Sequence, residues 1–84
     1  MRQKQWDLVK KVWEKGHEID GYDPLHYRRD DFGALICFSC HGKKNLGVYS
    51  WEIDHIISKR MGGSNSISNL RPLHWRNNRL KGSS

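Results

Sequence analysis

Apolar residues recur at helical spacing on one face of residues 3–15: Trp6, Val9, Val12 and Trp13. Lysines lie opposite this face, and Gly16 follows as a helix stop signal. The pattern predicts an amphipathic helix within residues 1–16. Apolar stripes on helices usually face a core, so we expect the two tryptophans to pack inside rather than stack on nucleic-acid bases.

Two later segments, residues 34–39 and 48–55, are rich in apolar, aromatic and β-branched residues and predict strands. Residues 41–47 between them are rich in Gly, Lys and Asn, so we expect the two strands to form a β-hairpin. Apolar and polar residues alternate along the second strand, which predicts one buried and one polar face. Residues 17–33 hold many turn formers and predict a connecting loop.

A loop and a second helix are expected after these strands. Residues 58–69 hold two adjacent Gly and several Ser, which predict a loop. Pro72 suits the first position of a helix, which we expect to run to about Lys81. The closing residues 82–84 are typical of a frayed tail. The predicted order after the first helix is therefore strand, strand, helix.

Composition changes this picture mainly through charge. At 84 residues the chain has room for one domain with a small core, to which four Trp, three Tyr and two Phe contribute. The formal net charge of +6, from 15 Lys and Arg against 9 Asp and Glu, attracts polyanions such as nucleic acid. On charge alone, a soluble basic protein without such a partner is an equal alternative. No apolar run is long enough to cross a bilayer, so we expect a cytoplasmic protein without a membrane partner.

Side chains suited to catalysis and metal binding gather in the last third of the chain: Asp54, His55, Asn69, His74, Asn77, Asn78 and Lys81. On the predicted final helix His74, Asn78 and Lys81 share one face, which can fold back over the end of the second strand. Hydrolysis of a phosphodiester needs an activated water and stabilisation of charge at the phosphate. A neutral histidine can accept a proton from water, and an Asp–Asn pair of oxygen ligands suits Mg²⁺ or Mn²⁺.

The same segment carries a resemblance to a known family. Positions 51–82 resemble the HNH endonucleases of the ββα-metal, or His-Me finger, superfamily, and read WEIDHIISKRMGGSNSISNLRPLHWRNNRLKG. The shared motif is a strand ending in Asp-His, a Gly-Gly loop, an Asn-Leu pair and a helix with Asn and Lys. Asn69 precedes Asn78 by nine residues and Asn78 precedes Lys81 by three, as the motif requires. Residues 21–36, GYDPLHYRRDDFGALI, are similar to the lead-in of some HNH proteins.

The resemblance implies a fold and an activity. The fold is a small single α+β domain over residues 1–84, with a ββα-metal core, a β-hairpin followed by a helix, at residues 34–82. The activity is metal-dependent hydrolysis of phosphodiester bonds, with double-stranded DNA as the expected substrate and a 5′-phosphate and 3′-hydroxyl as products. A larger phage or mobile-element machinery, restriction and intron homing are equally open settings, since the family serves all of them. A noncatalytic nucleic-acid-binding module that keeps the fold is the alternative.

The resemblance also implies roles for five residues. His55 would be the general base that activates water. Asp54 and Asn78 would hold one divalent cation, which is Mg²⁺ or another ion such as Mn²⁺ or Ni²⁺. Asn69 would hold the histidine-bearing strand in place, and Lys81 would lie near the phosphate.

Basic residues flank the proposed site, and we expect them to contact backbone phosphates: Lys59, Arg60, Arg71, Arg76 and Arg79. Such contacts carry no sequence information by themselves. The sequence has no evident element for reading bases. We therefore expect either cleavage with little base preference or recognition of the nucleic acid by its shape.

Two cysteines raise the question of structural zinc. Many HNH proteins carry two CxxC pairs around zinc, and Cys37 and Cys40 match the first pair. His74 and Asn77 stand in place of the second pair, and two Cys with His and Asn make a poor tetrahedral set. We therefore expect the cysteines to pack in or beside the hairpin, and His74 to have a structural role. A zinc-stabilised interaction domain is the competing prediction.

Overall fold

The computed structural model describes residues 2–42 and 47–82 of the chain. Residues 43–46 of the predicted 41–47 loop and residues 83–84 of the predicted 82–84 tail therefore lie outside the described residues. The helices and strands follow in the order α1 (Arg2–Trp13), β1 (Tyr27–Arg29), β2 (Leu35–Cys37), β3 (Trp51–His55), β4 (Leu70–His74) and α2 (Trp75–Lys81). Short 3₁₀ turns separate some of them: η1 (Phe38–Cys40), η2 (Lys59–Met61) and η3 (Ile67–Asn69). The predicted α+β fold class is confirmed.

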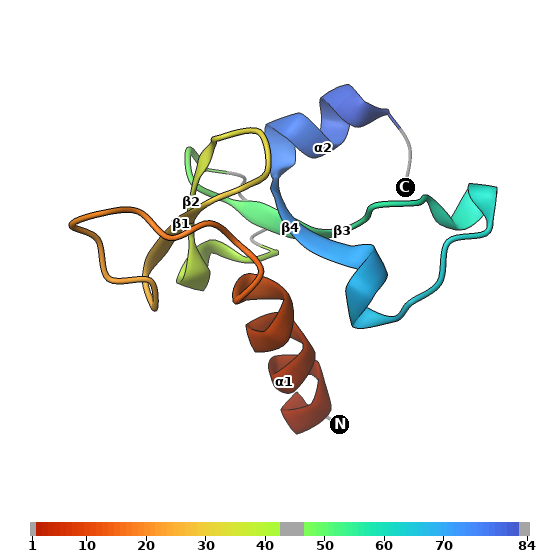
Figure 1. The fold of residues 1–84 in the computed structure, drawn as a ribbon, viewed down its shortest axis with the longest axis horizontal. Coiled ribbons are helices and arrows are strands. Elements are labelled where there is room, and N and C mark those ends of the chain that lie inside the picture. The colour runs from red at the N-terminus through yellow and green to blue at the C-terminus, as the bar shows by residue number, and fades with distance from the viewer. Residues whose placement is uncertain (1, 43–46, 83–84) are drawn as a thin grey trace.

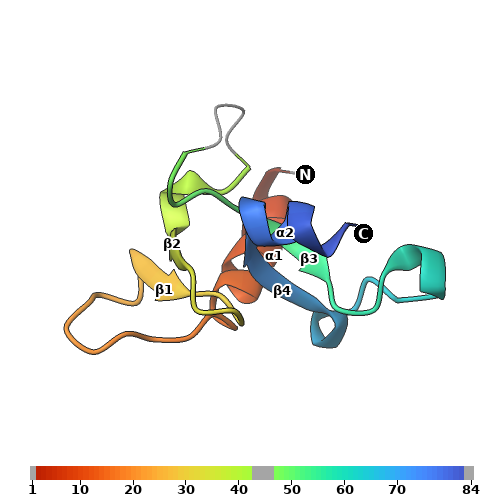
Figure 2. The same cartoon turned by 90° about the horizontal axis from the view of Figure 1, so that it is seen from above.

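The strands form two antiparallel pairs, β1 with β2 and β3 with β4. Helix α1 packs against one side of the β3–β4 pair, and α2 folds back over the other side (Figures 1 and 2). Figure 1 also shows the loop that joins β3 to β4 extending well away from the two helices. The β3–β4 pair and α2 together make the strand–strand–helix unit.

The predicted strand pairing was wrong. Strand β2 pairs with β1, from a segment expected to be loop, and β3 pairs with β4 instead of β2. The predicted helix start was also wrong, because Pro72 lies in β4 opposite Ile53 and α2 begins at Trp75. Both strands of a two-stranded sheet are edge strands, where a residue without an N–H is tolerated. His74 supplies the helix cap, since its side chain accepts a hydrogen bond from the Arg76 N–H.

Aromatic packing between α1 and β3 forms the centre of the core. Trp51 is fully buried, and its ring centroid lies 5.3 Å from that of Trp13. Their indole N–H groups donate to the carbonyl oxygens of Phe38 and Pro24, so neither burial leaves a polar group unpaired. The prediction that both tryptophans of the helix pack inside is confirmed for Trp13 but was wrong for Trp6, which is 53% exposed, although its ring contacts that of Phe38.

The long β3–β4 loop is closed by one asparagine side chain. The Asn69 Oδ1 accepts from the Ile57 N–H at 2.8 Å, and its Nδ2 donates to the carbonyl oxygens of Ile57 at 3.0 Å and Ser64 at 2.8 Å. We call these hydrogen bonds of Asn69 to Ile57 and Ser64 the Asn69 clamp. Gly63 lies so close to it that a Cβ on Gly63 would be 1.7 Å from the Ile57 carbonyl oxygen. The loop is therefore fixed by polar contacts and close packing rather than by an apolar core of its own.

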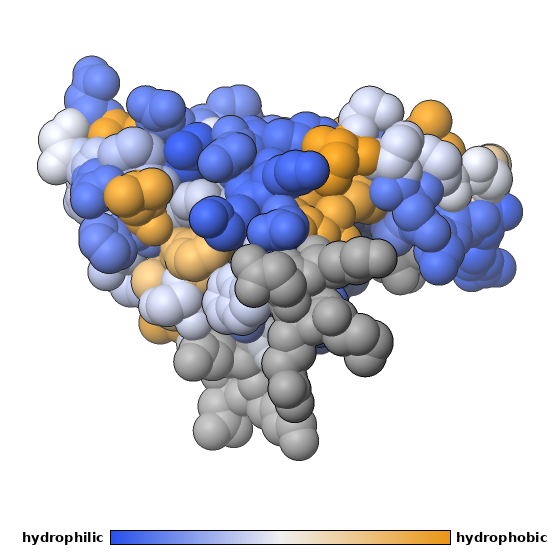
Figure 3. Space-filling model, turned by 90° about the horizontal axis from the view of Figure 1, so that it is seen from below, coloured by the Kyte–Doolittle hydropathy of each residue, from blue (hydrophilic) through white to orange (hydrophobic). Residues whose placement is uncertain are grey.

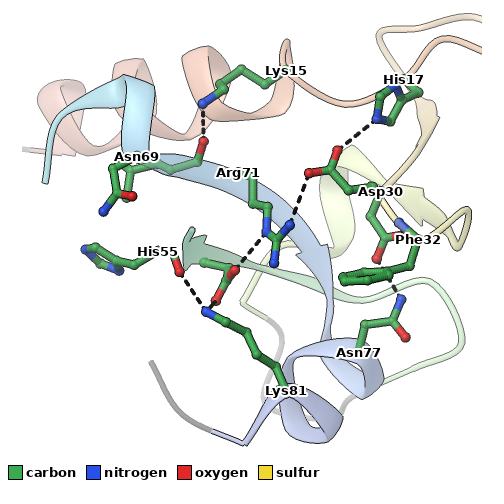
Figure 4. Close-up of polar contacts among 12 residues, drawn as sticks. Lys15, His17, Asp30, Phe32, His55, Asn69, Arg71, Asn77 and Lys81 are labelled. Atoms are coloured by element: carbon green, nitrogen blue, oxygen red, sulfur yellow. Dashed lines mark hydrogen bonds and ion pairs between the residues drawn. The ribbon is translucent and has the colours of Figure 1, made fainter. Parts of the chain in front are cut away.

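A buried carboxylate ties the first half of the chain to the second. Asp30 is 1% exposed, and its Oδ1 accepts from the backbone N–H groups of Phe32 and Ala34. Its Oδ2 accepts from the His74 N–H at 3.0 Å and from the Asn77 side chain at 2.8 Å (Figure 4). These bonds join the β1–β2 turn to the junction of β4 and α2.

The neighbouring Asp31 makes a second, more exposed link. Its carboxylate lies 2.8 Å from the His17 Nε2 and 3.2 Å from the Arg71 Nη1. Burial raises the pKa of Asp31, but the hydrogen bonds from His17 and Arg71 outweigh it, so the pKa lies below its ordinary value of 3.8. The ionised form of Asp31 is therefore the one that stabilises the fold.

We expect Gly63→Ala to lower the free energy of unfolding by about 3 kcal/mol, because the new methyl group overlaps the Ile57 carbonyl. Gly47→Ala is the matched control, since a Cβ there meets only the Ser50 hydroxyl at 3.7 Å. Urea unfolding followed by circular dichroism measures both. Equal midpoints for the two variants would contradict the close approach at Gly63.

Asp31→Asn tests the acid dependence of stability. Since the folded-state pKa is lowered, the contribution of Asp31 is complete above pH 3.8 and is lost as pH falls through the folded-state value. The side chain is 41% exposed, so solvent screening limits the contribution to less than about 1 kcal/mol. We expect the variant to be less stable than the wild type at pH 5.5, and we expect this difference to shrink progressively as the pH falls below 3.8. A stability difference that does not shrink over this range would exclude this role.

Candidate active site

The side of β3 that faces α2 is acidic. Glu52 and Asp54 lie two residues apart in the strand, so both side chains project to the same side of the sheet. On α2, Asn78 and Arg79 contact Glu52, and Lys81 contacts Asp54. The strand end and the helix thus bring together two carboxylates, an amide and two cations.

Asp54 sits at the centre of this group and is fully buried. Its Oδ2 lies 2.9 Å from the Arg71 Nε, which comes from the paired position in β4. Its Oδ1 lies 2.9 Å from the Lys81 Nζ, which also donates to the His55 carbonyl oxygen at 2.7 Å. Figure 4 shows Arg71 and Lys81 reaching the end of β3 from β4 and α2. Two cations therefore neutralise this buried carboxylate.

His55 is the last residue of β3, and its half-buried ring points away from Lys81 (Figure 4). The ring Nε2 lies 2.8 Å from the Oδ1 of Asn65, in the β3–β4 loop. A carbonyl oxygen only accepts hydrogen bonds, so Nε2 is the donor and the neutral ring keeps Nδ1 as its acceptor. The following residue is also held, since the Ile56 N–H donates to the Asn69 carbonyl oxygen at 2.8 Å. The arrangement gives His55 a fixed tautomer with one basic nitrogen.

Asn69 and Asn78 occupy different places in the structure. Asn69 is buried and closes the loop behind His55. Asn78 lies on α2 and donates its Nδ2 to the Glu52 Oε1 at 2.7 Å. With the nitrogen of the amide engaged, the oxygen of Asn78 is the atom that can bind a cation.

Glu52 was not identified as a site residue from the sequence. Its two oxygens lie 2.8 Å and 3.2 Å from the two terminal nitrogens of Arg79. Burial raises the pKa of Glu52, but the hydrogen bonds from Arg79 and Asn78 outweigh it and hold the pKa below its ordinary value. The signal for Glu52 was its place two residues before Asp54, on the same face of a strand.

Asn65 was also missed, since a loop of Gly, Ser and Asn residues gives no indication of which side chain turns back to the strand end. Its contact with His55 spans ten positions in the chain. No periodic pattern could have predicted that contact.

The side chains near α2 fit a hard divalent cation by their chemistry. A carboxylate and an amide oxygen are ligands that Mg²⁺ accepts, together with water. The carboxylate of Asp54 is fully buried and binds one cationic side chain with each oxygen, so a metal would have to share an oxygen with Arg71 or Lys81. Among residues 2–42 and 47–82, no group of three or more His, Cys, Asp or Glu side chains is placed to hold a metal. Any cation here would thus depend on the amide of Asn78 and on water.

The residues considered for zinc have other partners. The Cys37 Sγ lies 3.3 Å from the Ser39 hydroxyl. Burial raises the pKa of the Cys37 thiol, but hydrogen bonds from Ser39 and Cys40 outweigh it and lower that pKa. His74 is buried, and its ring bonds the Arg76 N–H through Nδ1 and the Val48 carbonyl oxygen through Nε2. Both ring nitrogens of His74 are therefore used in holding the start of α2.

The five basic residues fall into two groups. Lys59, Arg60 and Arg76 are exposed, the first two in η2 at the end of the projecting loop. Arg71 and Arg79 are held by carboxylates, and the side chain of Arg71 is only 15% exposed. Lys59, Arg60 and Arg76 can reach backbone phosphates without breaking an ion pair, whereas Arg79, although its side chain is 54% exposed, is paired with Glu52.

The surface contains no membrane-spanning element within the described residues, since no helix there is long and apolar enough. Figure 3 shows one face of the molecule, on which hydrophilic side chains surround small apolar patches.

Comparison with known proteins bears on this site. The sequence pattern of the family described as HNH endonuclease matches residues 42–84, a little over half of the chain. That segment holds β3, the closed loop, β4 and α2, and with them the Asp54–His55 pair and Asn78. No significant match is found among curated proteins or among solved structures. On the match over residues 42–84, the chain belongs to the HNH endonuclease family.

Proposed function

We propose that this protein is a metal-dependent endonuclease that hydrolyses phosphodiester bonds in double-stranded DNA, leaving a 5′-phosphate and a 3′-hydroxyl. The observation that carries the proposal is His55, which is held by Asn65 with Nδ1 as its basic nitrogen, next to Asp54 at the strand end that α2 covers. A base beside a carboxylate and an amide is the set that hydrolysis of a phosphodiester requires.

His55 serves as the general base. Its Nδ1 takes the proton of the attacking water, while the Nε2–H bond to Asn65 orients the ring and stabilises the imidazolium that forms. General-base catalysis of this kind contributes about 10²- to 10⁴-fold to a rate. Asn69 supports catalysis indirectly, because its hydrogen bond to the Ser64 carbonyl oxygen holds the loop that carries Asn65.

Asp54 and Asn78 would hold the divalent cation, with Mg²⁺ as the expected ion and Mn²⁺ or Ni²⁺ as alternatives. The cation supplies Lewis-acid stabilisation of negative charge at the phosphate and the leaving oxygen. Lys81 holds α2 against the strand end through Asp54 and the His55 carbonyl, and its ammonium adds positive charge beside the phosphate.

DNA binding falls to the exposed cations. Lys59, Arg60 and Arg76 would pair with backbone phosphates, so affinity should fall steeply with added salt. Arg71 and Arg79 support the site through their carboxylate partners. One active site cuts one strand in each encounter, so double-strand cleavage would need a dimer or a second event. Work within a larger phage or mobile-element machinery, restriction and intron homing are equally open settings for this activity.

One observation favours the alternative of a noncatalytic binding module. Asp54 already has two cationic partners, so the fold is electrostatically complete at this point without a metal. The two functions differ in one observable: an endonuclease cleaves DNA in a way that depends on metal and His55, whereas a binding module does not cleave DNA at all.

We expect His55→Ala to lower the rate of plasmid nicking in Mg²⁺ or Mn²⁺ at least about 100-fold while DNA affinity is kept, because only the base is removed. His26→Ala is the matched control, since that side chain is 71% exposed and only faces Asp23. Supercoiled plasmid converted to open circles measures cleavage, and a gel shift measures affinity. Wild-type protein that binds plasmid but never nicks it with any divalent metal would establish the binding module instead.

Asn65→Ala should slow cleavage about tenfold at saturating DNA, since the ring of His55 loses its orienting partner but keeps its basic nitrogen. Ser68→Ala, in the same loop, is the control for loop damage. Single-turnover rates with an oligonucleotide duplex give the comparison. A loss in Asn65→Ala no larger than in Ser68→Ala would remove Asn65 from the mechanism.

A further inference from the structure

Glu52 lies between two residues of α2 and binds both. Its Oε1 accepts from the Asn78 Nδ2 at 2.7 Å and from the Arg79 Nη1 at 2.8 Å, and its Oε2 accepts from the Arg79 Nη2 at 3.2 Å. The Glu52 side chain is 25% exposed, so these bonds are partly shielded from water. Both oxygens of the carboxylate are engaged by α2.

The bond to Asn78 has a chemical consequence. An asparagine amide has two different ends, and only its oxygen binds a hard cation. An ionised carboxylate accepts hydrogen bonds and donates none, so Glu52 selects the nitrogen end of the amide. The oxygen end of Asn78 is then directed away from Glu52.

Arg79 makes this selection stronger. Its two nitrogens bind the two oxygens of Glu52, which holds the carboxylate in one orientation and keeps it charged. Because Arg79 follows Asn78 in the same helix, the orientation of Glu52 is set by α2 itself. Glu52 is thus occupied as an acceptor and acts through its neighbour.

We propose that Glu52 is a positioning residue for the metal site, which sets the Asn78 amide with its oxygen toward the cation. The inference rests on the proposed function, in which Asn78 is a ligand. Under this inference the Glu52–Arg79 pair orients Asn78. An ordinary surface ion pair contributes little by itself and does not involve a third side chain such as Asn78. Partners that orient a ligand are worth about 10- to 100-fold in metal affinity.

The positioning role can be tested with variants that change which of residues 52 and 78 donates the hydrogen bond between them. In Glu52→Gln the side chain keeps its shape but can bond either end of the Asn78 amide, so the orientation is lost. In an Asn78→Asp background the same change has the opposite effect, because a glutamine can donate to the new carboxylate whereas Glu52 repels it.

The measurement is Mn²⁺ affinity of the whole chain, by titration calorimetry and by the electron paramagnetic resonance signal of free Mn²⁺, without DNA. We expect Glu52→Gln to weaken Mn²⁺ binding about tenfold when residue 78 is Asn, and to leave it equal or tighter in the Asn78→Asp background. Glu18→Gln, an exposed site on the chain before β1, controls for the loss of one negative charge. Circular dichroism confirms that each variant is folded.

The outcomes separate this inference from the proposed function. Equal losses in both backgrounds, or no loss in either, would overturn the positioning role, since Glu52 would then act only through its charge or not at all. If the wild type binds Mn²⁺ and cleaves plasmid in that case, the endonuclease proposal stands alone. A wild type that neither binds Mn²⁺ nor cleaves would overturn both.

Discussion

The arrangement of strands and helix in the second half of this small protein depends on the contacts of one carboxylate, that of Asp54. It is fully buried and bonded to Arg71 of β4 and Lys81 of α2, so three consecutive elements of the strand–strand–helix unit meet on its two oxygens. Removing a carboxylate from water is costly, and only well-placed partners offset that cost. The same group is the proposed metal ligand, so the interaction that assembles the unit also supplies charge to its site.

Local patterns in the sequence predicted the local parts of this structure. The helical spacing of Val9, Val12 and Trp13 correctly placed α1 and its buried face, and the position of His55 at a strand end was also correct. The pairing of the strands was not predictable in the same way, because β3 and β4 are joined through a loop with no periodic pattern. Pro72 favoured a helix start on local grounds, and the tertiary pairing of β4 outweighed that preference.

The candidate site shows the same division. The Asp54–His55 pair and Asn78 could be found because their residue types and spacing form a motif, and the segment that contains them matches the HNH endonuclease family. Glu52 and Asn65 form hydrogen bonds to the side chains of Asn78 and His55, and such partners have no fixed spacing in the sequence. Their identification needs the folded positions of α2 and of the β3–β4 loop. The residues that orient a site are therefore harder to read from a sequence than the residues proposed to carry out its chemistry.

The hydrogen bonds of Asn69 fix both ends of the β3–β4 loop and leave one turn of the loop where inserted residues can be accommodated. Within the loop, the Gly63 N–H donates to the Ser58 carbonyl oxygen at 2.9 Å and closes a small ring of backbone that contains η2. The turn at η2 is exposed and lies outside the contacts that hold His55. Inserted residues at this turn would lengthen the ring without moving the strand end. The turn at η2 is thus a place where inserted residues can add new surface next to the site during evolution while the proposed general base keeps its position.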